Sequence, residues 1–491
     1  MPLIPLKIPP GVYRNGTDLE SSGRWRDASL VRWRNGSLRP VGGWRVRKEN
    51  AFGGVTRGMH SWQENSGSRW VAAGSHDSLY VMTSGNTVTD ITPATLSAGN
   101  VDATLNTGYG GAFYGFGFYG NPTVGSSIYA EATTWSLDNW GEYLVACNPQ
   151  DGVIWEWQLN TANNAAAVAN APVDNLGIVV TEERFLFALG AGGDPRKVQW
   201  SDREDNTTWT PAATNEAGDI TLQGSGQIMA GIRTRGQTLI LTDQDAHAAV
   251  YQGPPFVYGF ERVGTACGLV ARKAVASVDQ GVFWMGRNAF HYYDGSTVRE
   301  LPCEVHDYIF GDINNAQISK AWALSFGTEG EVWWFYPSSA SLECDRYVVY
   351  DYKANYWVIG TLARSSGIPR GVFQYPMMVD TGNELYEHEV GFNYDSASIF
   401  AESGPISLGN GDQVMQVTDL IPDEQTQGQV TTTFKTRFHP NDTERSYGPY
   451  TMANPTSVRF TGRQVRMRIN GTAADWRVGV MRVDAKPGGQ R

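Results

Sequence analysis

A repeated pair of short strands is the feature that most constrains the fold. Between residues 52 and 390, an apolar or aromatic run is followed by a polar turn and a second such run. The first runs begin near residues 71, 144, 185, 239, 282, 332 and 372, with spacings of 73, 41, 54, 43, 50 and 40 residues. Most spacings match the ~40–50 residues of a propeller blade. The pattern predicts an all-β protein with a β-propeller-like body of about six or seven blades, or, as the alternative, two stacked sandwiches.

Composition agrees with many short strands and with more than one domain. The 491 residues include 56 glycines, 12% aromatic residues and only 18% charged residues, which disfavours disorder and helical bundles. We expect a propeller-like body over residues 51–390. Residues 1–50 form an N-terminal arm, and together with residues 391–491 they build a smaller β platform.

The N-terminal arm has an unusual composition between residues 11 and 44. Tryptophan, arginine and glycine alternate there without a helical period. This favours an extended segment in which Trp25, Trp33 and Trp44 lie against another surface while the arginines face a polar partner.

The C-terminal segment supplies a candidate surface. Residues 459–471 and 476–484 read as two strands around a turn at Asn470 and Gly471. Period-two alternation predicts that Val465, Met467 and Ile469 point inward and that Arg466 and Arg468 point outward.

Charge is strongly segregated along the chain. Residues 1–50 carry ten Lys and Arg and four Asp and Glu, a net charge of +6, and residues 431–491 carry eleven and four, a net charge of +7. Because the whole chain has a net charge of −11, residues 51–430 carry −24. We infer one basic platform that docks a partner and one acidic body. The predicted interface residues are Arg24, Trp25, Arg32, Trp33, Arg39, Trp44, Arg463, Arg466, Arg468 and Trp476.

Two partners fit such a basic surface. Phosphate contacts in nucleic-acid complexes come mainly from Arg and Lys. Arg and Trp are also enriched among the binding hot spots of protein interfaces. We favour a protein interface, because no groove-reading or single-strand-binding module is recognisable.

A glycine and aromatic run at residues 107–127 falls in the longest gap between strand pairs. Gly115, Gly117 and Gly120 match Gly-x-Gly-x-x-Gly, but no strand, tight turn and helix surround them, so a dinucleotide site is not indicated. We interpret the run as an inserted structural loop or a subunit contact.

No catalytic, cofactor or metal site is predicted. The four cysteines, Cys147, Cys267, Cys303 and Cys344, lie far apart and are expected to be buried free thiols. His388 lies between Glu387 and Glu389, but neighbours on a strand point to opposite faces, so we expect a solvated strand end.

A glycosidase or glycan-binding propeller is the alternative function. Glycoside hydrolysis needs a pair of carboxylates, and the body holds many, for example Asp138, Glu142, Asp243 and Asp245. They are scattered rather than clustered, so the prediction is a protein that is not an enzyme.

The start of the chain does not resemble a secretory signal, since residues 1–10 are broken by prolines and lack a basic region. No apolar segment is long enough to span a bilayer. We therefore expect synthesis and assembly in a reducing cytoplasm and no stable membrane insertion.

Four stretches resemble virion tail proteins of short-tailed bacteriophages, podoviruses, and most of all their tail nozzle, also called tail tubular protein B. They are residues 23–33 with 39–44, residues 135–142, residues 198–205, and residues 463–469 with 476–479.

The resemblance implies a homohexameric tube whose platform docks under a ring of tail adaptor (head-to-tail connector) proteins. The propeller-like domains would point away from the capsid, and tail fibres are possible further partners. The tube would retain the packaged genome and then conduct double-stranded DNA during ejection. An acidic wall suits that role, because it repels duplex phosphates.

Overall fold

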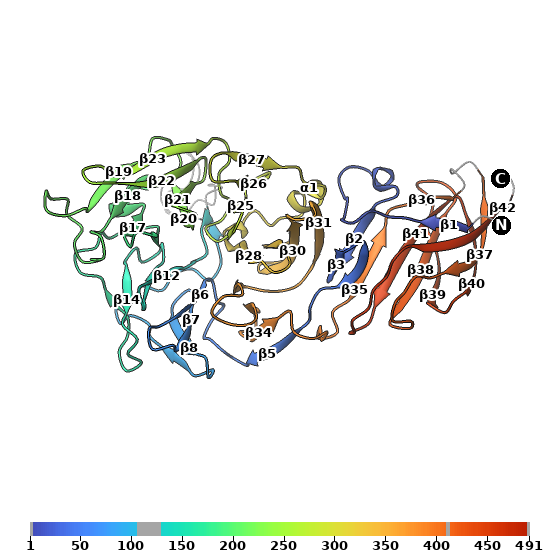
Figure 1. The fold of residues 1–491 in the computed structure, drawn as a ribbon, viewed down its shortest axis with the longest axis horizontal. Coiled ribbons are helices and arrows are strands. Elements are labelled where there is room, and N and C mark those ends of the chain that lie inside the picture. Colours follow the sequence, from blue (N-terminus) through green and yellow to red (C-terminus); the bar gives the residue numbers. More distant parts are fainter. Residues whose placement is uncertain (1–2, 106–128, 409–412, 489–491) are drawn as a thin grey trace, which may run out of the picture.

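The computed structural model describes residues 3–105, 129–408 and 413–488, so the run predicted as an inserted loop, residues 107–127, lies outside the described residues. The chain is nearly all β and divides into a ring of four-stranded sheets and a smaller platform of two sheets beside it (Figure 1). The ring is a β-propeller of seven blades, which confirms the predicted fold class.

Each blade is an antiparallel meander of four strands. The first six blades follow the chain: β6 (Met59–Gln63), β7 (Arg69–Gly74), β8 (Leu79–Thr83) and β9 (Val88–Asp90); β12 (Ser136–Trp140), β13 (Tyr143–Cys147), β14 (Trp155–Trp157) and β15 (Ala166–Ala167); β16 (Gly177–Val180), β17 (Leu186–Leu189), β18 (Lys197–Trp200) and β19 (Gly218–Thr221); β20 (Ile228–Thr234), β21 (Gln237–Thr242), β22 (Ala246–Gly253) and β23 (Val257–Gly264); β24 (Val275–Val278), β25 (Gly281–Met285), β26 (Phe290–Tyr293) and β27 (Val298–Leu301); β28 (Trp322–Phe326), β29 (Glu331–Pro337), β30 (Cys344–Asp351) and β31 (Tyr356–Thr361). A two-stranded antiparallel sheet, β10 (Thr104–Leu105) with β11 (Tyr129–Ala130), and a short helix, α1 (His306–Phe310), lie between blades.

The seventh blade is completed by a strand that precedes the first blade in the sequence. It contains β32 (Ser366–Ile368), β33 (Met377–Val379) and β34 (Leu385–His388), and its fourth strand is β5 (Trp44–Lys48). Val46 lies opposite Tyr386 in this pairing. The sequence-based boundary is therefore wrong here: β5 belongs to the body and not to the arm, because β34 would otherwise leave an open sheet edge.

The blades are held together by aromatic layers. All seven residues of β29 are buried, as expected for a strand covered on both faces. The rings of Trp322 and Phe335 stack within the sixth blade with centroids 4.4 Å apart. Phe290 of the fifth blade lies 4.9 Å from Trp334 of the sixth, which joins the two sheets.

The platform is built from both ends of the chain. One sheet has the order β2 (Trp25–Ser29), β35 (Ile399–Ser403), β41 (Gln464–Gly471), β38 (Val430–Arg437) and β39 (Arg445–Thr451), with β36 (Ile406–Ser407) beside β41; the other has the order β1 (Leu3–Leu6), β42 (Met481–Pro487), β37 (Met415–Ile421) and β40 (Thr456–Gly462). Phe434 and Phe460 connect the sheets, with ring centroids 4.9 Å apart. Each sheet thus contains strands from the two ends of the chain.

The expected C-terminal hairpin does not form. β41 pairs with β35, β36 and β38, whereas β42 begins only at Met481 and pairs with β1 and β37. Gly471 serves packing rather than a turn, because a Cβ at this position would lie 2.3 Å from the Trp476 indole. The predicted inward side chains of β41, Val465, Met467 and Ile469, are indeed buried.

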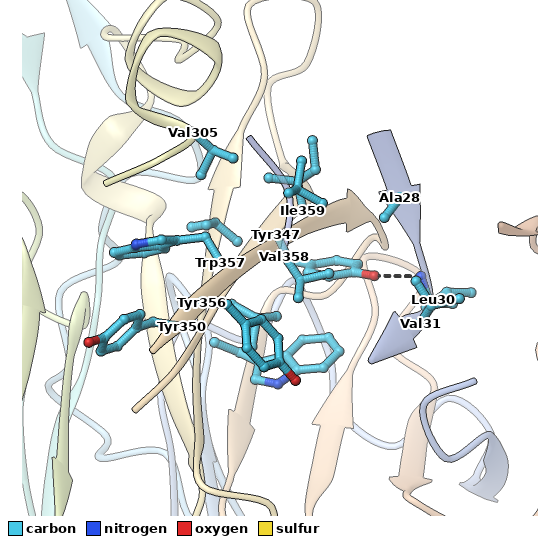
Figure 2. Packing of buried hydrophobic residues seen from close by; sticks show 14 of the residues in the cluster. Ala28, Leu30, Val31, Val305, Tyr347, Tyr350, Tyr356, Trp357, Val358 and Ile359 are labelled. Atoms are coloured by element: carbon cyan, nitrogen blue, oxygen red, sulfur yellow. Dashed lines mark hydrogen bonds between the residues drawn. The ribbon is translucent and has the colours of Figure 1, made fainter. Parts of the chain in front are cut away.

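The arm joins the platform to the sixth blade. Figure 2 shows the backbone N–H of Leu30 donating to the Tyr347 hydroxyl, a distance of 2.8 Å between two buried groups. The hairpin of β3 (Val31–Arg34) and β4 (Ser37–Pro40) continues this contact, and the ring of Trp33 meets Tyr356 edge-on at 5.7 Å. The platform therefore packs on the side of the propeller through β31 and β2.

Candidate functional site

The four tryptophans predicted as interface residues lie inside the chain. Trp25, Trp33 and Trp44 are each 3–4% exposed and Trp476 is fully buried. They fill the space between platform, arm and propeller, with Trp25 and Trp33 packing on each other at 5.8 Å. A side chain that is already buried cannot supply contact area to another protein. We therefore correct the assignment of these four residues to an intersubunit surface.

Arg32 is the most buried cation of the arm. Its guanidinium donates to Glu389 at 2.6 Å and to Glu331 at 3.2 Å, and lies 3.5 Å from Glu329. Burial alone would lower the pKa of Arg32, but the carboxylates around it, Glu331 foremost, raise it well above the usual value. Arg32 is therefore a permanent charge held by the propeller.

Arg34, two residues further along β3, extends this network on the same face of the hairpin. It donates to Glu331 at 2.8 Å, to Glu329 at 3.3 Å and also to Asp351. The two arginines of the arm thus share the Glu331 carboxylate, which is 2% exposed and would be costly to bury unpaired.

Two of the remaining predicted arginines, Arg24 and Arg468, form ion pairs within the chain. Arg24 donates to Glu304 of the propeller at 2.7 Å. Arg468 pairs with Glu402 at 3.0 Å and lies over the Phe400 ring. Arg39 is half-buried, and burial together with Arg477 lowers its pKa. The backbone N–H of Arg463 donates to the carbonyl of Arg437.

Arg466 binds the arm to the C-terminal sheet. It contacts Asp18, whose carboxylate also forms ion pairs with Arg437 at 2.8 Å and with Arg26 at 3.0 Å. Burial alone would raise the pKa of Asp18, but the hydrogen bonds and charges of Arg466 and Arg437 hold it below the usual value. Asp18 is therefore the acidic centre of a cluster of arginines.

Ion pairs within the chain account for the segregation of charge along the sequence. Cations of the ends pair with carboxylates of the middle: Arg24 with Glu304, Arg32 and Arg34 with Glu331, Arg47 with Glu387, and Arg468 with Glu402. The segregated charge therefore has partners within the chain itself. The basic ends therefore form ion pairs with the acidic middle of the same chain.

One face of the platform keeps its cations without such partners. On β40 and β42, buried residues alternate with polar ones, so Arg459, Arg482 and Lys486 share the outer face of their sheet, and Lys7 follows β1 on the same side. Within the described chain these four cations form no hydrogen bond or ion pair, and two carboxylates, Asp419 and Asp484, share the face. We call this surface, with its four cations and two carboxylates, the outer platform face.

The outer platform face is the most remote part of the molecule from the propeller (Figure 1). Sequence reasoning missed it because it weighted the dense Trp and Arg runs, which are buried. The signal that could have found it is the alternation of apolar and polar residues in 456–462 and 481–487.

The carboxylates considered for catalysis do not gather in one place. Asp138 forms an ion pair with Arg233 at 2.8 Å, and Asp245 lies 3.6 Å from Arg262. Glu142 accepts a hydrogen bond from the backbone of Asn65, and Asp243 from the backbone of Gln227. Each therefore has a local structural partner.

His388 is not the solvated strand end that we expected. It is 5% exposed, its ring lies 5.4 Å from Trp44, and Arg364 contacts its Nε2 at 3.1 Å. Burial and the neighbouring Arg364 hold the pKa of His388 well below the usual value, so it is neutral at pH 7. His388 packs against Trp44 at the point where β34 and β5 close the ring.

All four cysteines are free, and Cys147, Cys267 and Cys344 are buried, as predicted, while Cys303 is only partly so. Burial raises the pKa of the Cys147 thiol to about 12. Among the described residues, no three His, Cys, Asp or Glu side chains come together as metal ligands. No helix in the same part of the chain has the length and apolarity to cross a bilayer.

Comparison with known proteins gives similar folds only. No family model matches the chain, and no curated protein matches it significantly. Virginiamycin B lyase from Staphylococcus aureus is 7% identical, with 70% of this chain and 96% of that chain covered and a TM-score of 0.44. YCF48 from Cyanidioschyzon merolae is 9% identical, with 70% and 98% covered and a TM-score of 0.40. BamB from Moraxella catarrhalis is 8% identical, with 73% and 95% covered and a TM-score of 0.37.

Proposed function

We propose that this protein is a structural virion protein, the nozzle subunit that forms the distal tube of a short phage tail. The observation that carries the proposal is the outer platform face, which presents Lys7, Arg459, Arg482 and Lys486 at the end remote from the propeller. Sheet faces with unpaired cations attract an acidic partner, and both ends of the chain build this face. The resemblance of residues 23–44 and 463–479 to tail nozzle proteins concerns the same two ends.

In this proposal the platform docks to the tail adaptor ring, and six copies assemble around the path of the DNA. The propeller points away from the capsid and offers surface to tail fibres. The acidic body, with −24 over residues 51–430, keeps a passing duplex from adhering. The protein assembles in the host cytoplasm and resides in the virion tail.

The experiment that tests this function is a mass measurement of the purified chain, alone and with the candidate adaptor protein. We expect a complex of adaptor ring and six copies of the chain, and detection of the chain in purified particles. A chain that stays monomeric beside the assembled adaptor and is absent from particles would contradict the proposal.

A further inference from the structure

A cavity of about 220 Å³ lies on the propeller axis, where the first strands of the blades begin. Its lining includes four cations, Arg57, Arg272, Lys273 and Lys320, and no carboxylate. The volume is far larger than the roughly 10–15 Å³ that one water requires. The cavity can therefore hold a small ion together with several waters.

Three of the four cations are neutralised from outside the cavity. Arg57 pairs with Glu343 at 2.6 Å, and Lys320 pairs with the same carboxylate at 2.9 Å and also with Asp102. Arg272 lies 3.5 Å from Glu131. These pairs leave little positive charge for a ligand.

Lys273 differs from the other three. In the part of the chain that the structure describes, no hydrogen bond or ion pair reaches its ammonium, and the carboxylate that acts on it, Asp138, is already paired with Arg233. Burial lowers the pKa of Lys273 to about 8, so most of the population is charged at pH 7. Lys273 is half-buried, and an anion in the cavity would give its ammonium the acceptor that no described side chain supplies.

A second group in the cavity also lacks a partner. The Oγ atom of Ser366, at the start of β32, is buried and has no hydrogen-bond partner within the described chain. Ser366 and Lys273 line the same cavity. Buried hydroxyls are nearly always hydrogen-bonded in native structures, so this donor also points to a bound acceptor.

We propose that the axial cavity is a binding site for one small tetrahedral oxyanion of the phosphate or sulfate class, held by Lys273 and Ser366. An oxyanion offers several acceptors to donors on different blades, and its charge balances the one cation of the described cavity lining that forms no ion pair. The volume admits neither a peptide nor a nucleic-acid duplex. Such an ion would join the fifth and seventh blades at the axis.

The test uses the full chain and inorganic phosphate as the probe. Calorimetric titration at fixed ionic strength should show one saturable site, and Lys273→Met should weaken phosphate binding about tenfold or more, because a charge-assisted hydrogen bond is lost. Ser366→Ala should weaken it less. Lys197→Met, a propeller lysine that pairs with Asp219 away from the cavity, is the matched control and should bind normally.

A second measurement holds even if Lys273→Met fails to fold. In the unmodified protein, phosphate should protect Lys273 from acetylation, measured by peptide mass spectrometry, whereas sodium chloride at equal ionic strength should not. Absence of a saturable site, equal binding by the Lys273 and Lys197 variants, or no selective protection of Lys273 would overturn the proposal. These results do not depend on whether the chain assembles into a tail.

Discussion

Arg32 of the N-terminal arm and Glu331 of the sixth blade form an ion pair of 3.2 Å in which both side chains are buried. Almost 300 residues separate them in the sequence, and the pair lies where the platform joins the propeller. Since a buried charge without its partner is strongly unfavourable, the arm and the blade are expected to unfold together.

Replacing Arg32 tests this coupling. Arg32→Met leaves Glu389 without its cation and Glu331 with Arg34 alone, and we expect the free energy of unfolding to fall by about 3–5 kcal/mol in urea titrations. Arg45→Met is the matched control, because Arg45 also pairs with a propeller carboxylate but its side chain is 60% exposed. The control should change stability by less than about 1 kcal/mol. Equal effects of the two substitutions would contradict the account.

Removal of residues 1–50 should damage the propeller as well as the platform. The deletion takes away β5, so β34 loses its partner and the ring opens at the seventh blade. We expect faster amide hydrogen exchange in residues 377–388 of the truncated chain. Deletion of residues 1–8 removes only the edge strand β1 and should leave exchange in that segment unchanged. Unaltered exchange after the longer deletion would show that β5 does not close the ring.

Acid should loosen the contact between arm and C-terminal sheet. The pKa of Asp18 is lowered in the folded state. The contribution of its ionised carboxylate to the free energy of unfolding is therefore fully present above the unfolded pKa of about 3.8 and is lost as the pH falls through the folded pKa. We expect Asp18→Asn to destabilise the protein at pH 6, with a difference from the wild type that shrinks toward pH 2. Urea unfolding across this range measures it. A difference independent of pH would exclude the ionised carboxylate as the cause.

Charge reversal on the outer platform face should separate docking from folding. We expect the triple variant Arg459→Glu, Arg482→Glu and Lys486→Glu to lose binding to the adaptor ring while its thermal unfolding stays close to that of the wild type, because these side chains lie outside the core. The matched control reverses three exposed propeller arginines, Arg196, Arg262 and Arg299. Its adaptor binding should persist. Equal loss in both variants would indicate a non-specific charge effect.

The middle strands of the blades were predictable from sequence, whereas the closure was not. Runs such as residues 331–336 are apolar throughout because both faces of β29 are covered. β5 has one buried residue in five and pairs with a strand some 340 residues away. Local alternation carries no signal for so distant a partner.

The chemistry of the ends was predictable, but the surface that it contacts was not. Trp33 and Arg32 have the composition of a binding hot spot, and the same residue types fill a junction between two parts of one chain. Sequence pattern alone cannot distinguish the two cases, because both exclude water from the same aromatic and guanidinium groups. The Trp476 segment was misassigned for a related reason: Trp476 packs on Gly471, and Val478 forms isolated bridges with Leu38 and Glu424 instead of continuing a strand.

The most direct test of the proposed function is a density map of the chain bound to the adaptor ring. The account predicts a ring of copies in which the sheet of β1, β42, β37 and β40 faces the adaptor and the seven-bladed propellers point away from it. A map in which the propellers contact the adaptor, or in which the outer platform face is exposed to solvent, would contradict it.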